Sequence, residues 1–121
     1  MRTVRLRDVA KVIRSKNSGP FELTLDVMFP DAATYRRVRD ARVFTPASVA
    51  ALYGIPPERV LKVVHYEPAF AVKATLVRPL VSGAIGETDV YGAQQHAPLL
   101  DMELPEDVAS PEVNPGTRRV R

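Results

Sequence analysis

The chain has 121 residues, of which 45% are hydrophobic and 26% charged, so its size and composition are those of one ordinary globular domain. Because it has no cysteine, it can form neither a disulfide nor a cysteine-ligated metal site, and it has no thiol nucleophile. No stretch stays apolar over the roughly 18 residues of a membrane span, and residues 1–13 lack the apolar block of a signal peptide. We therefore expect a soluble, cytoplasmic protein.

The formal net charge of +3 raises the question of nucleic-acid binding. The basic residues fall into three groups, and the last group lies in a segment that is predicted to be a flexible tail. The chain has no Trp on which bases could stack, and its Phe residues lie mainly on apolar faces. We do not expect a nucleic-acid-binding protein. The groups are Arg2, Arg5, Arg7, Lys11, Arg14 and Lys16; then Arg36, Arg37, Arg39 and Arg42; then Arg118, Arg119 and Arg121.

The opening segment fits two structures. Val4 and Leu6 suit a strand, whereas Val9, Val12 and Ile13 also fit helical spacing, so both stay open with strand preferred. Residues 15–19 then concentrate a cation, two hydroxyls, an amide and a glycine, which indicates a polar turn.

Residues 21–29 alternate apolar and polar side chains, which predicts a strand with one buried face. Pro30 ends it, and Asp31 can cap a helix in which Ala32, Tyr35 and Val38 share the inner face. The polar face of the strand, with Glu22 and Asp26, and the helix face with Arg36, Arg37 and Arg39 are expected to be solvated.

Thr45 and Pro46 are typical of a helix start, since the hydroxyl can cap free N–H groups and proline loses no hydrogen bond there. Gly54 is placed to end this helix. Residues 61–66 and 70–77 then alternate as strands, and the short connection at 67–69 favours an antiparallel hairpin.

Residues 82–88 read as a loop, 89–97 as a short helix and 99–104 as a last apolar segment, such as an edge strand. The Pro-containing stretch 105–121 reads as a flexible tail, which leaves 1–104 as a single domain. The order of elements predicts an α+β fold, a ferredoxin-like sandwich with a mainly antiparallel sheet and helices on one face.

Three stretches, residues 13–26, 52–56 and 86–100, resemble a small family known as domain of unknown function 4387. The likeness covers nearly everything from Val4 to Leu104. It implies an association with larger proteins that resemble the acyclic terpene utilisation protein AtuA. That neighbourhood implies catabolism of acyl-CoA or of branched organic acids. The family gives no residue a catalytic role.

The first candidate ligand-binding group is Arg14, Ser15, Lys16 and Asn17, whose charges and N–H groups could bind a carboxylate or phosphate. A plain polar connection is an equally good interpretation. The second group, residues 88–96, contains Asp89, Tyr91, Gln94, Gln95 and His96, and a helix there would gather several of these on one ligand. A capped helix at an interface is the favoured interpretation of this group.

His65 alternates with apolar residues and is expected to be packed and hydrogen-bonded. With two histidines and no suitable spacing, no metal site and no resident cofactor are predicted, although a CoA thioester stays open as a substrate.

Two functions remain, and whether the chain is an enzyme stays open. The preferred hypothesis is an accessory subunit of the larger AtuA-like protein, itself expected to form a homo-oligomer. The alternative is an independent small lyase, hydratase or isomerase for an organic acid or its CoA ester. In that case Lys16 or Arg14 would hold the carboxylate and His96 or Asp89 would move a proton, with Lys16, Asp89 and His96 as the catalytic candidates.

Overall fold

The computed structural model describes residues 2–19, 21–77 and 97–109. Its centre is a four-stranded sheet in the order β2-β3-β5-β4, in which every neighbouring pair is antiparallel. The strands are β2 (Val12–Asn17), β3 (Glu22–Met28), β4 (Val60–Tyr66) and β5 (Ala71–Val77).

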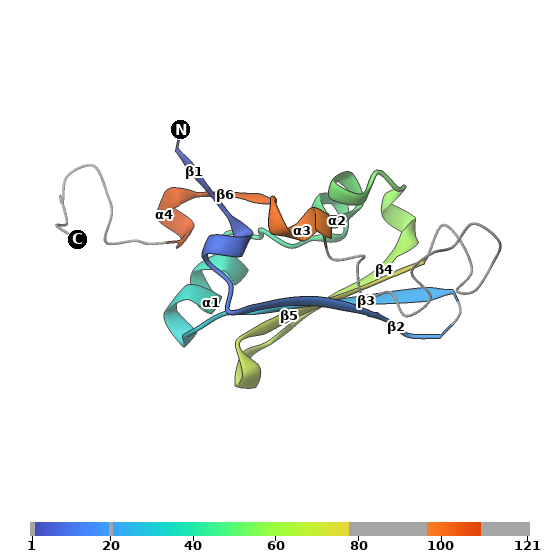
Figure 1. Ribbon diagram of the computed structural model, residues 1–121, viewed down its shortest axis with the longest axis horizontal. Coiled ribbons are helices and arrows are strands. Elements are labelled where there is room, and N and C mark those ends of the chain that lie inside the picture. The colour runs from blue at the N-terminus through green and yellow to red at the C-terminus, as the bar shows by residue number, and fades with distance from the viewer. Residues whose placement is uncertain (1, 20, 78–96, 110–121) are drawn as a thin grey trace, which may run out of the picture.

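The helices and strands outside this sheet lie on one side of it (Figure 1). Strands β1 (Thr3–Arg5) and β6 (Glu103–Pro105) pair with each other in a second, two-stranded sheet. The helices are α1 (Ala32–Asp40), α2 (Pro46–Tyr53), α3 (Ala97–Leu100) and α4 (Glu106–Ala109), with 3₁₀ turns η1 (Leu6–Asp8), η2 (Pro57–Arg59) and η3 (Glu67–Ala69).

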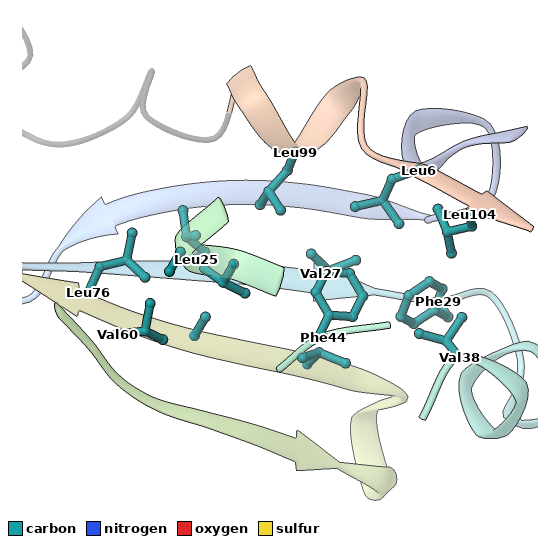
Figure 2. Packing of buried hydrophobic residues seen from close by; sticks show 14 of the residues in the cluster. Leu6, Leu25, Val27, Phe29, Val38, Phe44, Val60, Leu76, Leu99 and Leu104 are labelled. Carbon is teal, nitrogen blue, oxygen red and sulfur yellow. The ribbon is translucent and has the colours of Figure 1, made fainter. Parts of the chain in front are cut away.

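The hydrophobic core lies between the four-stranded sheet and this covering layer. Leu25, Val27 and Phe29 point from the β3 segment into it, as Figure 2 shows. The segments near both ends of the chain supply fully buried partners: Leu6 and Leu104 have no exposed surface. The ends of the described chain are therefore part of the core.

Both main helices begin at caps that the sequence predicts. The Asp31 side chain accepts a hydrogen bond from the backbone N–H of Thr34 at 2.7 Å, and this bond lowers the pKa of Asp31. At α2, Thr45 and Ser48 form a capping box, with Ser48 N–H donating to Thr45 Oγ1 at 3.0 Å. Gly54 ends α2 in the left-handed conformation, with φ of 65°.

Thr45→Ala should lower the free energy of unfolding by about 1 kcal/mol, because it removes the acceptor for an otherwise unbonded N–H group. Urea unfolding followed by circular dichroism measures this loss. Ala47→Ser, an exposed change on the same helix, is the control and should cost less. Equal losses for the two variants would contradict the assigned cap.

The α+β class is confirmed, as are the strand in residues 21–29, helices α1 and α2, and the β4–β5 hairpin. Strand β5 lies between β3 and β4, so β3, the helices and β4 form the split unit that a ferredoxin-like sandwich contains. However, β3's outer neighbour is β2, which precedes it in the chain. The finer ferredoxin-like assignment stays a prediction.

The predicted turn at residues 15–19 is wrong at its start. Ser15, Lys16 and Asn17 belong to β2, which continues to pair with β3, so the turn begins only at Ser18. The opening segment does contain a strand, β1. Of the residues for which helical spacing was the alternative, Val12 and Ile13 belong to β2 and Val9 follows the 3₁₀ turn η1.

The predicted tail begins too early, because Pro105 is the last residue of β6 and residues 106–109 form α4. Arg37 holds this helix: its Nε donates to the carbonyl of Val108 at 2.8 Å. The arginine face of α1 is thus not simply solvated, since Arg36 likewise donates to Glu67 at 2.6 Å. The predictions for residues 110–121, for the loop at 82–88 and for a helix at 89–96 lie outside the described residues. Among the described helices, none is long and apolar enough to cross a membrane.

Candidate functional site

The second face of the four-stranded sheet carries the Arg, Lys, Asp and Glu side chains of its strands. In β3, Leu23, Leu25 and Val27 point into the core, so Thr24 and Asp26 point to the opposite face. No helix or other strand of the described chain packs on this opposite face, which we call the open face, and only the hairpin turn η3 borders it (Figure 1). Strand pairing decides which side chains of the four strands meet there.

One row of the open face runs across all four strands. Arg14 pairs with Asp26, Asp26 with Lys73, and Lys73 with Val64. The Nε of Arg14 donates to Asp26 Oδ2 at 3.3 Å, and Lys73 Nζ lies 4.0 Å from Asp26 Oδ1. A nearly buried carboxylate thus lies between two exposed cations.

The next row places a lysine at each side of the sheet. Lys16 pairs with Thr24, Thr24 with Thr75, and Thr75 with Lys62. Both threonines are buried, whereas both lysines are exposed. This row therefore adds two cations to the open face and no acidic group.

A hollow of about 460 Å³ occupies the open face. Its charged lining consists of Arg14, Asp26, Lys62 and Lys73. Its other lining residues are Met28, Val64, Tyr66, Ala69 and Ala71. The volume is in the range of small-molecule sites, which are usually mainly apolar with a few convergent polar groups.

The structure separates the first group of predicted site residues. Arg14 and Lys16 lie on the open face, whereas Ser15 is buried and pairs with the core residue Leu25. Asn17 alternates with Lys16 and so points to the same side as Ser15. Whether any of the four binds a ligand stays a prediction.

Sequence reasoning missed Asp26, Lys62, Lys73 and Tyr66 as members of one surface. The solvated face predicted for Asp26 is wrong, because that residue is only 7% exposed. The alternation within residues 61–77 could have placed both lysines on a common face. Their convergence with Asp26 requires the order of the strands, which alternation does not give.

The second predicted group, Asp89, Tyr91, Gln94, Gln95 and His96, lies outside the described residues. Its meeting with Lys16 in one pocket, which the alternative lyase hypothesis requires, stays a prediction. In residues 2–19, 21–77 and 97–109, no three His, Asp or Glu side chains lie together as metal ligands would.

His65 lies on the core side of β4, opposite Val72. It is packed as expected, but within the described part of the chain its buried Nε2 has no hydrogen-bond partner. Burial lowers the pKa of His65, and the positive charge of Arg39 lowers it further. Both effects favour the neutral form of His65.

We expect the stability of the protein to fall as pH drops below the ordinary pKa of His65, about 6.5. In that range the unfolded chain binds a proton that the folded chain does not, so acid favours unfolding until the lowered folded pKa is passed. Urea unfolding at pH 7.5 and 5.5 should show a smaller loss for His65→Gln than for the unsubstituted protein. Since all other titrating groups are shared, equal losses would contradict this role.

Comparison with known proteins identifies the family. Residues 6–103 match the sequence profile described as "Domain of unknown function (DUF4387)". No curated protein matches the chain, and no solved structure does. The match covers most of the chain, including all four strands of the central sheet. The chain therefore belongs to the DUF4387 family.

Proposed function

We propose that this protein is an accessory subunit that binds a larger protein through the open face of its sheet. Following the family resemblance, the partner is an AtuA-like protein, and the pair acts in the catabolism of acyl-CoA or branched organic acids. In this complex the smaller chain supplies part of the surface of the larger protein.

The observation that carries this proposal is that large apolar side chains are exposed on the open face, on which no helix or strand of the described residues packs. Tyr66 is 56% exposed and Val64 is 42% exposed, and both line the hollow. Aromatic residues beside apolar ones are typical of the centres of protein interfaces, and a tyrosine buries a large area at low entropic cost.

The charges of the open face support a particular kind of partner surface. Four cations, Arg14, Lys16, Lys62 and Lys73, lie on it with two carboxylates, Glu22 and Asp26. Asp26 is already paired with two of the cations, and the face keeps an excess of positive charge. A partner that presents carboxylates would complement this face and associate faster at low salt. The proposed partner surface therefore presents carboxylates beside an apolar patch.

Co-expression with the larger AtuA-like protein tests the proposal. A tag on the small chain should retain the larger protein at a fixed ratio, and light scattering of the eluate should give the mass of a defined complex. The small chain alone, measured in the same way, reports whether it forms a homo-oligomer. If the two proteins elute separately at micromolar concentrations, the proposed function is wrong. Screening the complex and each part against acyl-CoA thioesters and branched acids then assigns the activity.

A further inference from the structure

The hollow of the open face is lined by charged side chains and by apolar side chains. Arg14, Lys62 and Lys73 give it three cations, and Asp26 is the one carboxylate among its lining residues. The hollow therefore keeps an excess of two positive charges, three minus one. Positive charges arranged around a concave surface attract an anion.

Asp26 also pairs with two of the cations. Its carboxylate is anchored in the middle of the sheet on β3, with the Arg14 Nε 3.3 Å away on one side and the Lys73 Nζ 4.0 Å away on the other. Because both cations are exposed and have further N–H donors, each can bind a second acceptor while it stays beside Asp26. Lys62 and Lys73 approach from neighbouring strands, β4 and β5.

The remaining wall of the hollow is apolar. Met28 and Ala71 are paired across β3 and β5, and Ala71 is paired with Tyr66 on β4. The row Met28–Ala71–Tyr66 thus lies directly beside the charged row that contains Asp26 and Lys73. A methyl side chain at the centre of this row leaves space between two larger ones.

From this juxtaposition we infer that the hollow binds a small amphipathic carboxylate, with its anionic group at Arg14, Lys62 and Lys73 and its hydrocarbon part along Met28, Ala71 and Tyr66. A simple inorganic anion would leave the apolar row unused, and a neutral hydrocarbon would leave the cations unused. The inference rests on the proposed function in one respect: the ligand would be enclosed when the partner covers the open face. Binding itself is a property of the small chain alone.

The test is a titration of the isotope-labelled chain with hexanoate, followed by amide resonances in two-dimensional NMR. Hexanoate should shift the resonances of β2, β3, β4 and β5 and saturate. Acetate, which keeps the charge, and hexan-1-ol, which keeps the chain, should each bind at least roughly tenfold more weakly. Equal affinity for hexanoate and either of these, or shifts confined to other elements, would overturn the inference.

Two substitutions are expected to change the affinity for hexanoate in opposite directions. Lys73→Gln should weaken hexanoate binding roughly fivefold, as expected for the loss of one exposed ion pair. Asp26→Asn should strengthen it, because the excess positive charge of the hollow rises from two to three. Arg59→Gln, an exposed cation outside the hollow, should leave the affinity unchanged and is the matched control.

Other outcomes assign the surface differently. If inorganic phosphate or a short single-stranded oligonucleotide binds as tightly as hexanoate, the site recognises anions in general and the inference fails. If Lys73→Gln and Arg59→Gln weaken binding equally, only the overall charge matters and the inference also fails. Because these titrations use the small chain by itself, their outcome is independent of whether the larger protein binds.

Discussion

Leu104→Ala should lower the free energy of unfolding by about 2–5 kcal/mol, the range for truncating a fully buried leucine. Leu104 has no exposed surface, and it faces Val4 across the small β1–β6 sheet. Figure 2 shows its side chain beside that of Phe29, which directly follows β3. Removing it opens a cavity in the core between the central sheet and the covering layer.

Urea unfolding measures this loss, and Leu61→Ala is the matched control. Leu61 is 49% exposed, so its truncation should change the free energy of unfolding by no more than about 0.5 kcal/mol. If Leu104→Ala were as mild as Leu61→Ala, the segment around β6 would not be part of the cooperative fold.

The sequence predicts those elements whose signals are local. The alternation that places Leu23, Leu25 and Val27 on one face needs only neighbouring residues. Likewise, Asp31 and Thr45 act on N–H groups three residues away, so the helix starts are visible in a short window. These predictions are confirmed.

Pairings between distant segments have no such local signal. The backbone N–H of Leu6 donates to the carbonyl of Met102 at 2.8 Å, and Arg7 forms an ion pair with Asp101. This hydrogen bond and this ion pair thus join two segments that lie near opposite ends of the described chain. Local composition instead predicts a tail after Leu104, because charged residues and prolines are frequent there. The packing of Val108 against the core gives no signal in that composition.

The residues of the candidate site could likewise be predicted only in part from the sequence. Arg14 and Lys16 stand out in the sequence because they lie in a conspicuously polar run. Lys62 and Lys73, in contrast, alternate with apolar residues in a manner common to any half-exposed strand. Only the order β2-β3-β5-β4 brings the four cations onto one face and places Asp26 between two of them.

Tyr66→Ala should weaken association with the larger partner by about 2 kcal/mol or more, roughly thirtyfold or greater in Kd. Tyr66 stands on the outer strand β4 at the apolar wall of the hollow, with 56% of its surface exposed in the isolated chain. An exposed tyrosine costs little stability when removed, so the free energy of unfolding should change far less than the free energy of binding.

Phe21→Ala is the matched control for this prediction. Phe21 is 59% exposed, similar to Tyr66, but it precedes β3 and does not line the hollow. Titration calorimetry of each variant with the purified partner compares them directly. Loss of affinity in Tyr66→Ala alone would place the contact on the open face, because total exposed aromatic area changes similarly in both variants. Loss in Phe21→Ala alone would place the contact elsewhere and would contradict the open face as the docking surface.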